Sequence, residues 1–95
     1  MAAKTLLADR FNTEDGGTVQ MVVYQVEAGM KYTDGVRYRL FYVRDRRVIV
    51  GYDNHYPKGH HRHVGDRQEP YAFSSMERLV ADFLAEVGKS GGKRA

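Results

Sequence analysis

The chain of 95 residues contains no cysteine, which excludes disulfide bonds, thiolate metal sites and a cysteine nucleophile. It has no apolar run long enough to cross a membrane. Asp9 and Arg10 interrupt the N-terminal apolar residues before the core of a signal peptide could form. A glycine-rich phosphate loop, a nucleophile elbow and a zinc-finger spacing are also missing. These absences favour a soluble, cytoplasmic protein, and they give no indication of a cofactor.

The composition is 42% hydrophobic and 28% charged, as in one compact globular domain. The net charge of +3 is unevenly distributed. Residues 37–67 hold eight Lys/Arg against three Asp/Glu, a net +5, and the remaining residues hold seven against nine, a net −2. A basic segment of this kind favours binding to RNA, to DNA or to an acidic protein. A solvated strand face rich in arginine would have the same composition.

Four segments have the residue composition of β-strands, and a shorter fifth segment is also a candidate strand. Residues 36–43 show the pattern best, because apolar or aromatic residues alternate with Arg37 and Arg39. Asp15, followed by two glycines, predicts a tight turn between the first two strands. The predicted strands are residues 4–11, 18–26, 36–43 and 48–53, with 61–65 as a short fifth.

The stretch "SSMERLVADFLAEVG" predicts an amphipathic helix. Ser74 is a suitable N-cap, Glu77 completes a capping box, and Gly88 provides a C-terminal stop. The apolar residues at helical spacing are Met76, Leu79, Val80, Phe83, Leu84 and Val87. We therefore expect an α+β domain over residues 1–88. Its antiparallel meander of four to five strands would be covered on one face by the C-terminal helix, and residues 89–95 would form a disordered basic tail.

All four histidines lie between residues 55 and 63, and three of them fall in "GHHRHVGDR" (59–67). In an extended segment His61 and His63 project from the same face, roughly 6–7 Å apart at their α-carbons. Asp53 or His55 could add a third ligand to such a pair, so a metal-binding protein is one hypothesis. An exposed loop rich in histidine without a function is another.

Acid–base chemistry on RNA is the third hypothesis, and it needs no metal ion. His61 and His63 would transfer protons, with His60 as a further candidate, and Asp53 would orient an imidazole. His60 would share a strand face with Arg62, opposite His61 and His63. The candidate substrate-binding residues are Arg62, Arg67, Arg37 and Arg39 for phosphate, and Tyr52 and Tyr56 for stacking on a base.

The stretch "GYDNHYPKGHHRHVGDRQEPYAFSSMERLVADFL" resembles the TumE-type family, small prokaryotic toxins of toxin–antitoxin pairs. The shared pattern is a strand ending in Tyr-Asp-Asn (52–54), His-His-Arg-His (60–63), a Glu-Pro step (69–70) and a C-terminal helix. It covers residues 36–87, and residues 1–35 match only in their strand pattern. The resemblance implies a cytoplasmic toxin with a cognate antitoxin, commonly a helix-turn-helix protein. It leaves the reaction open.

The leading hypothesis is a toxin that acts on RNA through metal-independent, ribonuclease-like chemistry at the His/Arg cluster. The expected partners are the antitoxin and RNA, with no membrane; homodimerisation is left open. The alternatives are a non-enzymatic basic module that binds nucleic acid or an acidic antitoxin, and a His/Asp metal-binding protein.

Overall fold

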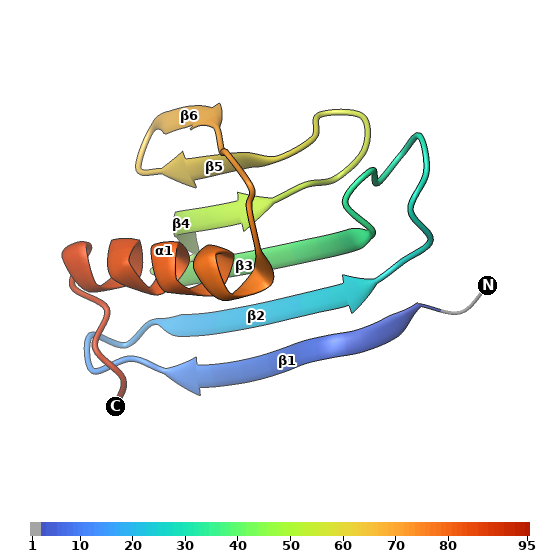
Figure 1. Cartoon of the computed structure of the whole chain (residues 1–95). Coiled ribbons are helices and arrows are strands. Elements are labelled where there is room, and N and C mark those ends of the chain that lie inside the picture. Colours follow the sequence, from blue (N-terminus) through green and yellow to red (C-terminus); the bar gives the residue numbers. More distant parts are fainter. Residues whose placement is uncertain (1–2) are drawn as a thin grey trace.

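The computed structural model describes residues 3–95 as one antiparallel sheet with a helix across one face (Figure 1). Six strands follow one another in chain order, and each pairs antiparallel with the next. The elements are β1 (Lys4–Asn12), β2 (Thr18–Gln25), β3 (Val36–Arg44), β4 (Arg47–Asp53), β5 (His61–Val64), β6 (Arg67–Pro70) and α1 (Met76–Lys89). The predicted α+β meander is confirmed, with six strands in place of four or five.

Strand β6 is the element that the sequence did not reveal. Its four residues, RQEP, lack apolar alternation, and Pro70 has no N–H to donate. The strand forms because Gly65 adopts a positive φ of 59°, and the resulting turn places Arg67 opposite Val64. Pro70 is tolerated because β6 lies at the edge of the sheet.

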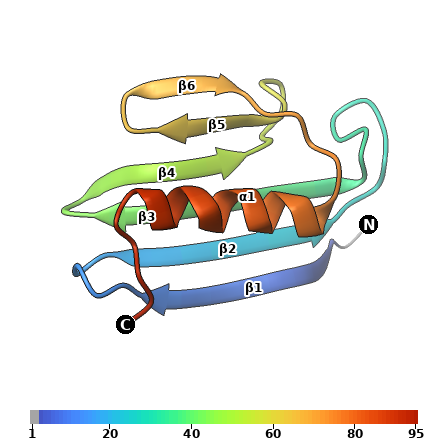
Figure 2. The same cartoon turned by 60° about the vertical axis from the view of Figure 1, so that its left-hand side comes forward.

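The core lies between α1 and the sheet face beneath it, as Figure 2 shows. In β3 the predicted alternation is confirmed, because Tyr38, Leu40 and Tyr42 are only 2%, 0% and 0% exposed. The buried core residues are Val19, Met21, Val23, Tyr38, Leu40, Tyr42, Val50, Tyr52, Leu79, Phe83 and Val87. Leu84 lies at the edge of the row of apolar residues along α1 and is 38% exposed.

Both ends of α1 differ from the sequence prediction. Ser75 is the N-cap instead of Ser74, because the Ser75 side chain accepts a hydrogen bond from the N–H of Arg78 at 3.1 Å. The helix continues past Gly88 to Lys89, and Gly91, at a φ of 91°, follows the C-cap Ser90. Among the described residues no helix is long and apolar enough to cross a membrane.

Residues 89–95 were expected to form a disordered tail, but after α1 ends the chain contacts the β1–β2 turn. The N–H of Glu14 donates to the carbonyl of Lys93 at 2.7 Å, and the N–H of Ala95 donates to the carbonyl of Asn12 at 2.9 Å. The guanidinium of Arg94 lies 4.6 Å from the centroid of the Phe11 ring. These backbone hydrogen bonds fix the tail at one end of the sheet.

Candidate functional site

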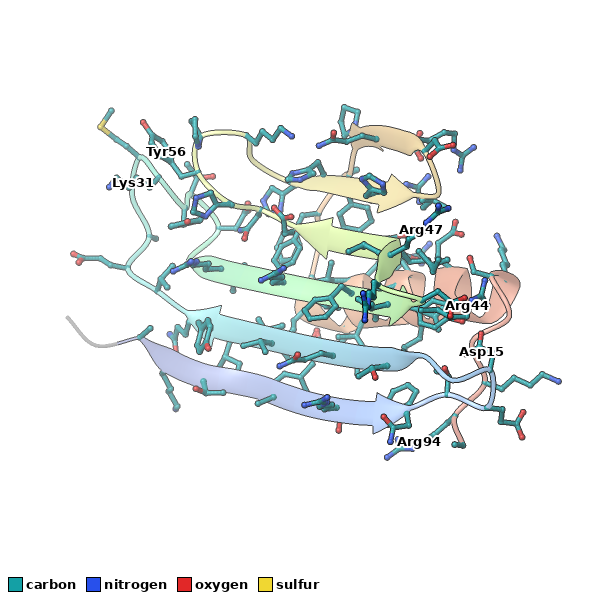
Figure 3. The ribbon with its side chains drawn as sticks, turned by 180° about the vertical axis from the view of Figure 1, so that it is seen from behind. Asp15, Lys31, Arg44, Arg47, Tyr56 and Arg94 are labelled. Carbon is teal, nitrogen blue, oxygen red and sulfur yellow. The ribbon has the colours of Figure 1, made fainter. Side chains whose placement is uncertain are left out.

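The face of the sheet opposite α1 is uncovered, and it carries the candidate site (Figure 3). Cross-strand partners place their side chains on the same side of a sheet, so the register shows which residues share this face. Two adjacent rows cross β3, β4 and β5. The first row is Arg39, Asp53 and His61, and the second is Phe41, Gly51 and His63. We call these six residues together the open-face cluster.

Each ring nitrogen of His61 lies near a hydrogen-bond acceptor. Nδ1 is 2.9 Å from the carbonyl oxygen of Gly59, and Nε2 is 3.3 Å from Oδ1 of Asp53. Whichever nitrogen carries the N–H, it has an oxygen acceptor beside it. Asp53 Oδ1 also accepts a hydrogen bond from the N–H of His55 at 3.1 Å, which positions the carboxylate. The Gly59 carbonyl and the Asp53 carboxylate therefore lie on either side of the His61 ring.

His63 is the second histidine of the open-face cluster, two residues after His61 on β5. Within residues 3–95 its ring takes part in no side-chain hydrogen bond or ion pair, so both of its nitrogens are available to a ligand. The α-carbons of alternate strand residues are roughly 6–7 Å apart. One phosphate group can therefore lie between the two imidazoles.

A hollow lies above Gly51, at the centre of the open-face cluster. Its volume is about 210 Å³. The side chains that surround it include Arg39, Phe41, Val48, Asp53, His61 and His63. Because both histidines border the hollow, a group bound there would lie beside them.

Arg37 and Arg39 supply positive charge on the same face. The guanidinium of Arg39 lies 4.9 Å from the centroid of the Phe41 ring. In the part of the chain that the structure describes, neither arginine forms an ion pair within 4.0 Å. Two further hollows, of about 470 and 450 Å³, adjoin both arginines. The two guanidinium groups are therefore free to bind an anion.

Tyr52 and Arg62, two of the predicted substrate-binding residues, do not lie on this face, and both are engaged by other side chains. Tyr52 is 1% exposed beneath α1, with its ring against Tyr71 and Phe83, so it has no free face for a base. Arg62 is held by Glu69 at 2.7 Å, and it donates to the Tyr52 hydroxyl at 3.3 Å. The hydrogen bond to Tyr52, and then that to Glu69, raise the pKa of Arg62. Burial raises the pKa of Tyr52.

His60 also lies on the helix side. This agrees with the prediction that it shares a face with Arg62, opposite His61 and His63. Its Nε2 is 2.7 Å from a carboxylate oxygen of Asp34, and its Nδ1 is 2.8 Å from the Tyr38 hydroxyl. The ring stacks on Phe73 with centroids 4.8 Å apart. Tyr38 is 2% exposed, and burial raises the pKa of its hydroxyl. Through these contacts His60 links the β2–β3 loop, which contains Asp34, to the helix side of the sheet.

The last two candidate residues, Arg67 and Tyr56, lie outside the open-face cluster. Arg67 is exposed, but it pairs with Val64 and so belongs to the helix side of the sheet. Tyr56 is 46% exposed in the β4–β5 loop, where the Nζ of Lys31 lies 5.6 Å from its ring centroid. Figure 3 shows Lys31 and Tyr56 together at one end of the molecule.

The metal hypothesis required a third ligand beside His61 and His63. Within residues 3–95 no three His, Asp or Glu side chains form a group that could hold one metal ion. Of the proposed additional ligands, Asp53 lies beside His61, whereas His55 is an exposed residue after the end of β4. The described residues therefore form no three-ligand centre of the kind that the hypothesis needs.

Phe41 and Gly51 are the members of the open-face cluster that sequence reasoning did not identify as site residues. A glycine inside a predicted strand often marks a close approach by a ligand or by another segment, and this signal was present at Gly51. Phe41 could have been found from the alternation of β3, which places it on the same side as Arg37 and Arg39.

One family model, described as toxin TumE, matches residues 5–90. No curated protein and no solved structure is similar enough to the chain to count as a match. The family match covers all six strands and the helix except for the first residue of β1.

Proposed function

The chain belongs to the TumE toxin family, and from this membership and the open-face cluster we propose that it is the toxin of a toxin–antitoxin pair that cleaves RNA without a metal ion. The observation that carries the proposal is that two histidines share the open face: His61, which lies beside Asp53, and His63, which has no side-chain partner among residues 3–95. RNA in the cytoplasm would be the substrate, and the antitoxin would be the protein partner.

The two histidines have different roles in this proposal. His63, which has no partner among the described residues, accepts the proton of the ribose 2′-hydroxyl as that oxygen attacks phosphorus. His61, whose ring lies between the Gly59 carbonyl and the Asp53 carboxylate, acts in its protonated form and donates a proton to the leaving 5′-oxygen as the phosphorus–oxygen bond breaks. The products are a 2′,3′-cyclic phosphate and a 5′-hydroxyl.

Asp53 and Arg39 assist this reaction in different ways. Asp53 orients the ring of His61 and stabilises its positive charge through the 3.3 Å contact. Arg39 stands beside Asp53 in the same row and stabilises the negative charge that develops on the phosphate oxygens. Arg37 binds a neighbouring phosphate. Arg62 has no role at this phosphate, because its guanidinium is engaged on the helix side.

The test is cleavage of total cellular RNA by the purified protein in EDTA. We expect discrete cleavage by the wild type, and a loss of at least about 100-fold in rate when His61 and His63 are both replaced by Ala. Arg67→Ala is the control, because Arg67 is exposed, lies on the helix side of the sheet and is outside the two rows. Circular dichroism shows whether each variant folds.

Two results would contradict the proposal. Intact RNA with the wild type, both in EDTA and after addition of zinc or magnesium, would remove the ribonuclease function. Equal cleavage by the wild type and the folded double variant would remove His61 and His63 from the chemistry.

A second function, non-enzymatic binding of nucleic acid or of an acidic antitoxin, is favoured by Arg37 and Arg39 on the open face, which form no ion pair with the rest of the described chain. In that case Arg37→Ala/Arg39→Ala should abolish toxicity in cells, whereas His61→Ala/His63→Ala should leave it nearly unchanged. The opposite ranking would support the enzymatic function.

A further inference from the structure

Gly51 stands in the interior of the sheet, where glycine is an unusual residue. It lies in β4, between β3 and β5, and it is not among the glycines with a positive φ. Glycine in a strand interior costs stability, since it has no side chain to pack and loses more backbone entropy on folding. An added Cβ would lie 3.2 Å from Cγ1 of Val48 and 3.8 Å from Cβ of His63. The 3.2 Å contact is tight, but both atoms belong to side chains, so a Cβ here requires a shift of the Val48 side chain and not of the backbone.

The hollow of about 210 Å³ has Gly51 among its lining residues, together with side chains from β3, β4 and β5. This volume is below the range of about 300–1,000 Å³ that is usual for drug-sized ligands. Its borders combine the apolar side chains of Phe41 and Val48 with the polar groups of Asp53 and the two histidines. Such a hollow suits a single planar ring with polar edges.

We propose that this hollow binds one unpaired nucleobase, so that the substrate is single-stranded RNA and the base lies next to the phosphate between His61 and His63. The inference rests on the proposed function and specifies its substrate. A duplex keeps its base faces stacked inside the helix, whereas a base of a single strand can turn into a hollow and contact an aromatic ring. The Asp53 carboxylate accepts hydrogen bonds from amino groups on a base edge.

The charge of the open face is complementary to a single RNA strand. The strand residues that the register places on this side include three arginines, Arg10, Arg37 and Arg39, against the one carboxylate of Asp53. The hollow of about 470 Å³ between β2 and β3 has Tyr24 and Phe41 among its lining residues, and it shares Arg39 with the hollow above Gly51. A strand can therefore continue from one hollow to the next, with its phosphates at the arginines and a base on Tyr24.

The experiment measures binding separately from cleavage. The probe is a fluorescent single-stranded RNA with 2′-O-methyl riboses, which lacks the attacking hydroxyl, and it is compared with the same strand annealed to its complement. We expect the wild type to prefer the single strand, and Gly51→Leu to weaken single-strand binding about tenfold while duplex binding stays unchanged. Gly88→Leu is the matched control, because a Cβ added at Gly88 has nothing within 4 Å.

A second variant keeps the test valid if Gly51→Leu does not fold. Val48 is 45% exposed and borders the same hollow, so Val48→Leu partly fills it without changing β4 at Gly51. This variant should weaken single-strand binding in the same direction by a smaller factor.

Cleavage of unmodified RNA, measured in parallel, separates the two proposals. If the wild type cleaves RNA but the folded Gly51 and Val48 variants bind the single strand as the wild type does, the base site is overturned and the ribonuclease function stands. Equal binding of single strand and duplex by the wild type also overturns it. If the wild type does not cleave but Gly51→Leu loses single-strand binding, the base site stands and the ribonuclease function fails.

Discussion

At the scale of single residues, neighbours in the chain have different surroundings because side chains alternate along a strand. His60 is enclosed on the helix side by Phe73 and Tyr38, whereas His61 and His63 face the open side. The shared face of His61 and His63 could be predicted from their spacing alone. The contact between Asp53 and His61 could not be derived, because it depends on the register between β4 and β5.

Asp15 provides a prediction about pH. Hydrogen bonds from the Thr13 and Tyr42 hydroxyls, from Arg44 and from the N–H of Gly17 hold the pKa of its carboxyl well below the usual value. A lowered folded-state pKa contributes stability that is complete above the unfolded pKa of about 3.9 and is lost as the pH falls toward the folded value. Asp15→Asn should therefore destabilise the protein at pH 7 and have a shrinking effect below about pH 4.

Urea unfolding at several pH values measures this change. Asp66→Asn is the control, because Asp66 is an exposed carboxyl in the β5–β6 turn. A destabilisation by Asp15→Asn that stays the same down to the lowest pH would show that Asp15 acts through packing and not through its charge. Figure 3 shows Asp15 beside Arg44, at the end of the sheet where Arg94 also lies.

At the scale of elements, strong periodicity in the sequence was a better guide than short strands or helix ends. The alternation of β3 and the apolar stripe of α1 identified their buried faces correctly. The strand β6 has no such period, since it forms through a turn at Gly65 and pairing with β5. Ser74 and Ser75 are equally suitable N-caps from their chemistry. The hydrogen bond from the N–H of Arg78 to the Ser75 side chain shows which of the two caps the helix.

The stripe of α1 allows a prediction about stability. Phe83 is fully buried, and its ring meets Tyr52 edge-on with centroids 5.7 Å apart, whereas Leu84 is 38% exposed. Phe83→Ala should lower the free energy of unfolding by about 3–5 kcal/mol, and Leu84→Ala by about 1 kcal/mol or less. Equilibrium unfolding in urea compares the two variants with the wild type. Equal losses would mean that α1 packs on the sheet through a different face.

At the scale of the whole molecule, the charge of the basic segment is divided between the two sides of the sheet. Arg37 and Arg39 face the open side, while Arg62 and Arg67 belong to the helix side. The net +5 of residues 37–67 therefore overstates the charge available to one ligand. Composition predicted a polyanion partner for the segment, but only the strand register assigns each arginine to a surface.

This division predicts how salt affects RNA binding. For single strands, the slope of log K against log salt concentration changes by about 0.7 for each phosphate that a protein cation neutralises. Replacing both Arg37 and Arg39 by Gln should reduce the magnitude of that slope by about 1.4, whereas Arg67→Gln should leave it unchanged because Arg67 lies on the other side. Titrations of the 2′-O-methyl strand at several salt concentrations provide the slopes. A reduction caused by Arg67→Gln alone would place the RNA across the β5–β6 hairpin, away from His61 and His63.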